Sequence, residues 1–219
     1  MRNRTAPTRL AAILVLAALP HMAYAQIGTG WKQIFPASNI QVETHDKINE
    51  FPGTSTSIVN GGGIYSKSGN VETFQLVNTT SNRVERRYHD EYSSGTRQLQ
   101  ADITIFAPSN NESIHQIFNG PTGPWLIVRE LNTSGGSVRM GGGTKSGLLA
   151  TGLYGKSFRL NSINNANTGA TKIYINGSLV WTGTNPGGTF YTKYGCYGTL
   201  GAASAKIQFR NVALFSGGK

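Results

Sequence analysis

The sequence is poor in cysteine, in acidic residues and in long apolar segments, and each shortage argues against a class of protein. Cys196 is the only cysteine, so no disulfide can form within the chain. Only 10 acidic residues stand against 20 Lys and Arg, which leaves few candidates for the two carboxylates that a glycoside hydrolase requires. No segment reaches the roughly 20 apolar residues of a membrane-spanning helix. A disulfide scaffold, a hydrolase and a helical membrane protein are therefore disfavoured.

The N-terminus has the pattern of a secretory signal peptide. Arg2, Arg4 and Arg9 precede an apolar run from Leu10 to Leu19, and small residues follow at Ala23 and Ala25. We predict that residues 1–25 are removed after Ala25 and that residues 26–219 form an exported protein, either secreted to the extracellular space or periplasmic.

The exported chain is basic, with 17 Lys and Arg and 10 Asp and Glu, a net charge of +7. A positive field attracts polyanions such as nucleic acid, anionic lipid or acidic polysaccharide. The sequence has no zinc-finger spacing, helical basic region or recognition-helix pattern, so we expect no nucleic-acid partner. We also expect no membrane partner. A charge that serves only solubility remains an alternative.

The apolar pattern predicts strands rather than helices. No segment after residue 25 keeps an i, i+3, i+4, i+7 apolar stripe for three turns, whereas short alternating runs recur between turn signals. Arg97 to Phe106 places Leu99, Ala101, Ile103 and Ile105 on one face. Further predicted strands include Arg83–Tyr88, Ser113–Phe118, Trp125–Glu130, Thr189–Tyr197 and the pair around the Asn176-Gly177 hairpin turn. We predict an all-β fold, a single-domain β-jelly roll in which two antiparallel sheets form a sandwich with a concave substrate groove.

The stretch Tyr191–Tyr197 carries an unusual strand face. Strand periodicity puts Tyr191, Lys193, Gly195 and Tyr197 on one side, where a half-buried strand normally shows apolar residues. Two phenols, an ammonium group and a glycine that leaves space for a ligand suit an anionic substrate. An aromatic edge strand with its hydroxyls in water is the alternative. Cys196, on the opposite face, is predicted to be a small buried hydrophobe.

A second strand face gathers charge. Arg83, Glu85 and Arg87 alternate on one side of their strand, and His89 follows in the same phase. The glutamate can orient the guanidinium groups and leave their outer donors free for a carboxylate ligand. A surface ladder of ion pairs is the alternative interpretation.

A third segment places His115 and Gln116 between isoleucines. Gln116 can donate to a carboxylate, and His115 could accept a proton. Because the two are adjacent, a regular strand points them to opposite faces, and both reach one groove only if a bulge intervenes. A structural histidine is the alternative for His115.

Together these segments resemble the jelly-roll polysaccharide lyases typified by the alginate lyases, with their relatives that cut glucuronan. That family shows R-x-E-x-R, Q-I-H and Y-F-K-A-G-x-Y in this order. Here the corresponding segments read R-V-E-R-R (Arg83–Arg87), Q-I-F (Gln116–Phe118) and Y-T-K-Y-G-C-Y (Tyr191–Tyr197). The resemblance implies a groove for an acidic polysaccharide and lysis by β-elimination. By the same resemblance, Tyr197 would be catalytic, Arg83 and Gln116 would neutralise the uronate carboxylate, and Lys193 and Arg87 would line the groove. From their strand faces we also expect Tyr191, His89 and Glu85 to be substrate-binding residues.

One position departs from the family, because Phe118 stands where the alginate lyases have histidine. Without that group the sequence suits a syn elimination, with Tyr197 as both base and acid, on a β-1,4-linked glucuronate or mannuronate polymer. Alternatively His115, His89 or, less favourably, His45 replaces the missing base. A non-catalytic jelly roll that binds acidic polysaccharide is a further alternative.

The expected chemistry requires no cofactor, and the sequence shows no metal-binding cluster. A structural calcium ion held by loop carbonyls is compatible with the fold. We expect the protein to act as a monomer.

Overall fold

The structure is a computed structural model that describes residues 26–45, 47–77, 81–141, 147–198 and 202–218. These residues form two antiparallel β-sheets packed face to face, with short 3-10 turns at Gly120–Thr122 and Thr133–Gly135. None of the helices within them is long and apolar enough to cross a bilayer. The predicted signal peptide, residues 1–25, lies outside the described residues.

The first sheet has nine strands: β1 (Trp31–Ile34), β4 (Ser57–Asn60), β5 (Gly63–Ser68), β6 (Val71–Leu76), β8 (Thr96–Phe106), β13 (Ser157–Asn165), β14 (Ala170–Ile175), β15 (Ser178–Thr184) and β17 (Ala205–Gly217). Their order is β15-β14-β13-β8-β17-β6-β5-β4, and β1 pairs with the C-terminal end of β17. Every pairing in this sheet is antiparallel.

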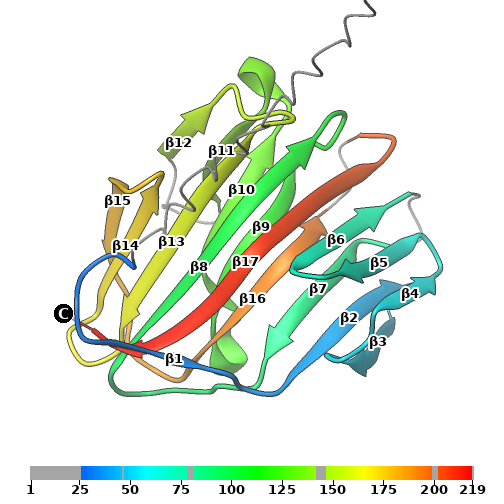
Figure 1. The fold of residues 1–219 in the computed structure, drawn as a ribbon. Helices are drawn as coiled ribbons and strands as arrows, with labels where there is room; N and C mark the ends of the chain where they lie inside the picture. Colours follow the sequence, from blue (N-terminus) through cyan, green and yellow to red (C-terminus); the bar gives the residue numbers. More distant parts are fainter. Residues whose placement is uncertain (1–25, 46, 78–80, 142–146, 199–201, 219) are drawn as a thin grey trace, which may run out of the picture.

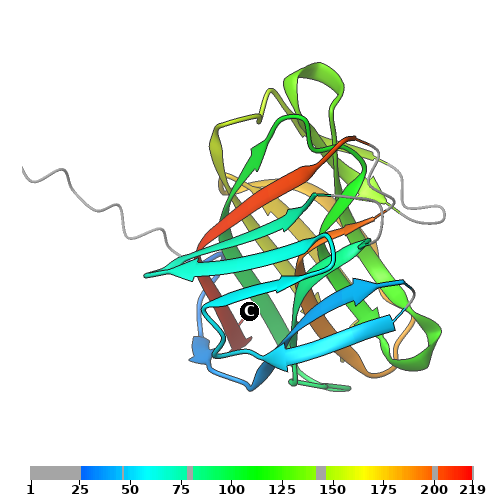
Figure 2. The ribbon, with the colours of Figure 1, turned by 90° about the vertical axis from the view of Figure 1, so that its right-hand side faces the viewer.

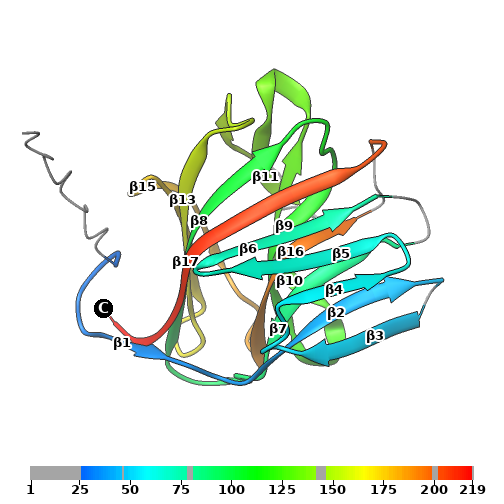
Figure 3. The same cartoon turned by 45° about the vertical axis from the view of Figure 1, so that its right-hand side comes forward.

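The second sheet has eight strands: β2 (Ser38–Thr44), β3 (Lys47–Pro52), β7 (Arg83–Tyr88), β9 (Glu112–Asn119), β10 (Pro124–Leu131), β11 (Ser137–Gly141), β12 (Gly147–Thr151) and β16 (Phe190–Gly198). Their order is β12-β11-β10-β9-β16-β7-β2-β3. Figures 1 and 3 show β17 (red) and β6 of the nine-stranded sheet crossing in front of β16 (orange) of the eight-stranded sheet, and Figure 2 shows the two layers from the side.

Alternation along the strands fills the space between the sheets. Leu99, Ala101, Ile103 and Ile105 on β8 are all buried, which confirms the predicted inward face. From the other sheet, β16 contributes Tyr194 and Cys196 to the same core, so Cys196 is a buried free thiol as predicted. Side chains that alternate with Tyr194 and Cys196 along β16 consequently point away from the core, to the outer face of the eight-stranded sheet.

A buried polar network ties the two sheets together. Arg86 on β7 points inward, and its Nε donates to Glu72 Oε2 on β6 at 2.9 Å. Tyr194 donates to Glu72 Oε1 at 3.0 Å, and Arg86 Nη2 donates to the Tyr65 hydroxyl at 2.7 Å. The inward Arg86 is thus structural, whereas Arg83 and Arg87 on the same strand face outward.

The hairpin predicted at Asn176-Gly177 is confirmed. Both residues have positive φ angles, 51° and 82°, as a primed two-residue turn requires. Ile175 and Ser178 pair directly across it. No strand was predicted between Trp31 and Asn60, where the structure has four, because β2 alone of these alternates clearly and its outward positions are polar.

Candidate active site

The three sequence motifs lie on three adjacent strands. β16 occupies the middle of the eight-stranded sheet between β7 and β9. Tyr197 pairs with Arg83, and Lys193 pairs with both Arg87 on β7 and Gln116 on β9. Because directly paired residues share a face, these side chains gather on the outer face of the sheet.

A bulge sets the register of this cluster. The pairing of β16 with β9 shifts between Tyr194 and Tyr197, so that Tyr194 lies opposite His115 and Tyr197 opposite Ser113. Gly195, within the bulge, has a φ of 147°, and a Cβ there would lie 2.5 Å from the Val84 carbonyl oxygen. A glycine is required at this position, and the bulge brings Ser113 beside Tyr197.

Tyr197 lies beside a guanidinium group. The Arg83 Cζ is 4.4 Å from the centroid of the Tyr197 ring, and both side chains are partly exposed. Arg83 Nε is 3.3 Å from Glu43 Oε2 and 3.4 Å from Glu85 Oε2. The two carboxylates fix the position of Arg83, whose guanidinium group lies against the face of the Tyr197 ring.

Glu85 is the centre of the network beneath this face. Its side chain is 1% exposed, accepts a hydrogen bond from Gln116 Nε2 and lies 3.8 Å from Lys193 Nζ. Burial raises the pKa of the Glu85 carboxyl, while Lys193, Arg83 and the Gln116 amide oppose that shift. Glu85 therefore links Arg83, Gln116 and Lys193 rather than meeting substrate itself.

Lys193 is held below the surface. Only 3% of the residue is exposed, Nζ donates to Gln41 Oε1 at 2.7 Å, and the Phe118 ring centroid lies 4.6 Å from Nζ. Burial lowers the pKa of Lys193 to about 8, against the attraction of Glu85. The predicted groove-lining role does not fit this position, and Lys193 instead supports the network from below.

Phe118, Tyr191 and Arg87 form an aromatic edge to the site. The rings of Phe118 and Tyr191 stack with centroids 5.0 Å apart, and the Arg87 Cζ lies 4.3 Å from the Tyr191 centroid. Arg87 also contacts Glu91 at 2.5 Å and hydrogen-bonds with the exposed His89. The position that holds histidine in the alginate-lyase motif is thus filled by a stacked ring that cannot exchange a proton.

His115 does not lie at this face. Its pairing partners Tyr194 and Val128 belong to the core, the residue is 1% exposed, and its Nδ1 is 3.0 Å from the Lys193 carbonyl oxygen. Burial lowers the pKa of His115 to about 4. The hypothesis that His115 is the base is not supported by this inward position. His45 is exposed in the turn between β2 and β3.

Carboxylates that a hydrolase could use are engaged in other contacts. Asp102 lies on β8 of the other sheet, 2.7 Å from Arg159, and Glu91 pairs with Arg87. No group of three or more metal-ligating side chains occurs among the described residues. Neither Asp102 nor Glu91 is therefore free for hydrolysis, and the part of the chain that the structure describes holds no metal cluster.

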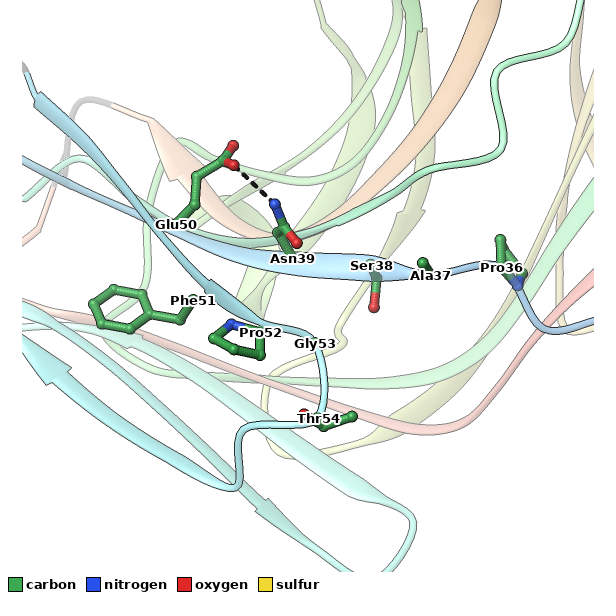
Figure 4. A pocket seen from close by; sticks show the side chains of 9 residues that line it. All are labelled: Pro36, Ala37, Ser38, Asn39, Glu50, Phe51, Pro52, Gly53 and Thr54. Atoms are coloured by element: carbon green, nitrogen blue, oxygen red, sulfur yellow. Dashed lines mark hydrogen bonds between the residues drawn. The ribbon is translucent and has the colours of Figure 1, made fainter.

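A hollow of about 600 Å³ borders the site at the β2–β3 edge (Figure 4). Asn39, which pairs with Arg87, lines it together with Glu50, and Asn39 Nδ2 donates to Glu50 Oε2 at 2.8 Å. Gln41 also donates to Glu50, and this hydrogen bond is the main reason why the pKa of Glu50 is lowered. A ligand on the outer face could extend into this hollow, which Phe51 and Pro52 line together with Asn39 and Glu50.

Further polar residues on the same face belong to no sequence motif, among them Ser113, Arg129 and Arg139. Ser113, opposite Tyr197, pairs with Arg129 on β10, and Arg129 pairs with Arg139 on β11. Arg129 Nη1 donates to Asn111 Oδ1 at 2.7 Å. Their outward phase is visible in the sequence, but their alignment with Tyr197 depends on strand order and on the bulges.

The fold is that of known lyases, although the sequence is distant from them. No protein-family model matches the sequence, and neither does any curated protein. The alginate lyase AlyC3 in complex with dimannuronate superposes with a TM-score of 0.65 at 15% identity, covering 83% of this chain and 90% of that chain. Alginate lyase PA1167 from Pseudomonas aeruginosa gives 0.64 at 15% identity, with 81% and 97% covered.

The alginate lyase from Corynebacterium sp. gives a TM-score of 0.62 at 15% identity, covering 82% of this chain and 94% of that chain. AlgAT5, an alginate lyase of polysaccharide lyase family 7, gives 0.60 at 17% identity, with 82% and 94% covered. At such identities the likeness establishes the fold, and it confirms the predicted all-β architecture of two packed antiparallel sheets. The chain has the β-jelly-roll fold of the family 7 alginate lyases.

Proposed function

We propose that this protein is an exported polyuronate lyase that cleaves a β-1,4-linked acidic polysaccharide by β-elimination. The observation that carries the proposal is the placement of Tyr197 beside Arg83 on the outer face, with Gln116 joined to Arg83 through Glu85. The similarity of the fold to that of the alginate lyases supports this reading. The fold alone does not specify an activity, so the residues of the site carry the argument.

The first requirement of the reaction is to stabilise charge on the uronate carboxylate. Removal of the proton at C5 pushes electrons toward this group, and donors fixed in advance stabilise the resulting enolate-like anion. Arg83 can supply its outer guanidinium donors, because its Nε is held by Glu43 and Glu85. We assign the second N–H of the Gln116 carboxamide to the same carboxylate. Glu85 orients this side chain, which is fully buried, so the side chains that cover it must move aside when the sugar binds.

The second requirement is proton transfer, which we assign to Tyr197. As a phenolate it takes the C5 proton, the C5 electrons form the C4=C5 double bond, the C4–O4 bond breaks, and the phenol returns the proton to the departing O4. A single group can serve both ends only if the C5 proton and O4 lie on the same side of the ring. Mannuronate and glucuronate meet that condition, whereas guluronate does not.

Phe118 supports a syn-selective site. The phenylalanine ring stacks on Tyr191 and offers no proton acceptor where the related motif has histidine, and His115 is turned into the core. His89 is the remaining candidate for a second base, since it is exposed and forms a hydrogen bond with Arg87. We therefore propose glucuronan or mannuronate-rich alginate as substrate, with Arg87, Tyr191 and His89 along the path of the chain and Tyr197 as base and acid.

The test is to incubate the purified protein with glucuronan, polymannuronate and polyguluronate and follow the ultraviolet absorbance of the unsaturated uronate product. Turnover of the first or second is expected, and equal turnover of polyguluronate would contradict the stereochemical part. Tyr197→Phe should lower kcat by about 10²–10⁴-fold. Tyr174→Phe on β14 of the other sheet is the matched control and should retain activity.

A non-catalytic binding module is the second candidate, and the stacked Phe118–Tyr191 pair favours it, because such aromatic surfaces also bind sugar rings. Retained binding of all three polymers without unsaturated product would establish this alternative. If Arg83→Gln then lost binding and Tyr197→Phe kept it, Arg83 would belong to the binding site and Tyr197 would not be needed for binding.

A further inference from the structure

We propose that Arg129 and Arg139 form a second carboxylate-binding subsite, which holds another uronate of the polymer chain whose reacting residue lies at Tyr197. The inference rests on the proposed function, since it assumes that a polyuronate crosses the outer face of the eight-stranded sheet. It adds two substrate-binding residues and a minimum length for efficient substrates.

Strand phase places both arginines on the face of Tyr197. On β10, Leu126 and Val128 are fully buried, so Arg129 points outward. On β11, Val138 and Met140 are buried, so Arg139 also points outward. Both arginine side chains are intermediate in exposure.

Strand pairing aligns them with the reacting residues. Glu43, Arg83, Tyr197, Ser113, Arg129 and Arg139 are successive partners across the adjacent strands β2, β7, β16, β9, β10 and β11. The row therefore runs perpendicular to the strands, with Tyr197 between one arginine on β7 and two on β10 and β11.

The two arginines face each other without a carboxylate between them. Like charges directly opposite on neighbouring strands repel each other. Among the described residues, neither makes an ion pair. Glu130, next to Arg129 in the sequence, points into the core, where burial raises its pKa to about 8, so it is a poor counter-charge. Two repelling guanidinium groups are stabilised when an anion binds both.

The alternative is that the pair is only a solvated part of the surface. Arg129 has a structural contact, since Nη1 donates to Asn111, but Arg139 makes no side-chain hydrogen bond within the described residues. The Arg129 side chain packs closely over Gly141, where a Cβ would lie 3.3 Å from Arg129 Nε. A carboxylate can therefore approach the two arginines from outside without displacing a salt bridge.

The geometry predicts a length dependence. Arg83 and Arg139 are four strand spacings apart, or roughly 19 Å at about 4.8 Å per spacing. A pyranose residue of an extended β-1,4 chain covers about one such spacing. An oligomer that occupies the Tyr197 position and also reaches Arg139 must then have about four or five residues.

The experiment measures kcat/KM for oligouronates of two to eight residues in the wild type and in Arg139→Gln. We expect the loss in the variant to grow with chain length and to reach about tenfold for the longest oligomers, the value of one charge-assisted hydrogen bond. Arg210→Gln, which removes an exposed arginine from β17 of the other sheet, is the matched control and should show no length-dependent loss. A loss of equal size at every length, or no loss at any length, would overturn the proposal.

A second measurement separates this proposal from the proposed function. Retardation of Tyr197→Phe and of the double variant Tyr197→Phe/Arg139→Gln is compared in native gels that contain polymannuronate or glucuronan. Weaker retardation of the double variant supports the subsite, even if the wild type releases no unsaturated product. The difference between the two variants should disappear at high salt, because salt screens the charge of Arg139. Equal retardation of both variants rejects the subsite even if the wild type is an active lyase.

Discussion

The outer face of the eight-stranded sheet has two halves that carry positive charge in different ways. In the carboxylate-lined half, on β2, β7 and β16, Arg83 lies beside Glu43 and Glu85, and Lys193 lies beside Glu85. In the arginine half, on β10 and β11, Arg129 and Arg139 face each other with no ion-pair partner among the described residues. Tyr197, on β16, lies in the carboxylate-lined half at its border with the other half.

The difference indicates a division of labour. Groups that must meet a reacting carboxylate at a defined angle gain from being fixed, and buried ion pairs with hydrogen bonds fix them at the cost of desolvation. Groups that only hold a distant part of the chain gain from remaining free to pair with the ligand. The carboxylate-lined half is therefore suited to positioning, and the arginine half to binding affinity.

The largest change in stability is expected when the buried carboxylate of Glu85 is removed. Glu85→Gln leaves Lys193 without its ion-pair partner and Arg83 with Glu43 alone, and it should lower the free energy of unfolding by about 3 kcal/mol. Urea denaturation at neutral pH measures the change. Glu91→Gln is the matched control, because Glu91 is substantially exposed beside Arg87 and its loss should cost less than about 1 kcal/mol. Equal effects would mean that the network around Glu85 does not position the site.

A pH-dependent effect is expected from the ionisation of Lys193. Its pKa is about 8 in the folded chain against 10.5 for a free lysine, so between these values the unfolded chain binds a proton that the folded chain does not. The free energy of unfolding of the wild type should therefore rise with pH in this window, relative to Lys193→Met, by up to about 1.4 kcal/mol per pH unit. The relative stability is lost again as the pH falls through 8. A pH-independent difference between the two proteins would show that Lys193 is not buried as described.

Local patterns in the sequence were sufficient for the strands that carry the motifs. Alternation predicted β7 with its observed bounds and assigned Tyr191, Lys193 and Tyr197 to one face. It also separated Arg83 and Arg87 from the inward Arg86, because the side-chain period of a strand is fixed at two. The predicted fold class required only that such runs recur without helical stripes.

Burial and register could not be obtained in this way. Lys193 was expected to line a groove, yet it lies beneath Phe118, since the depth of a side chain depends on neighbours from other strands. The bulge at Gly195 decides that Ser113, and with it Arg129, aligns with Tyr197. No sequence signal gives that alignment, because it joins strands whose pairing is set only by the whole sandwich.

The smallest expected change in stability, that of Arg139→Gln, distinguishes the two halves most clearly. Arg139→Gln should raise the free energy of unfolding by about 0.5 kcal/mol, because it relieves the repulsion with Arg129 directly opposite. The same substitution is expected to weaken the binding of long chains, so one residue would lose affinity while the fold gains stability. Thermal or urea unfolding at low salt measures the gain, which should shrink at high salt. Destabilisation by Arg139→Gln would indicate that Arg139 has a structural partner, and the arginine half would then resemble the carboxylate-lined half.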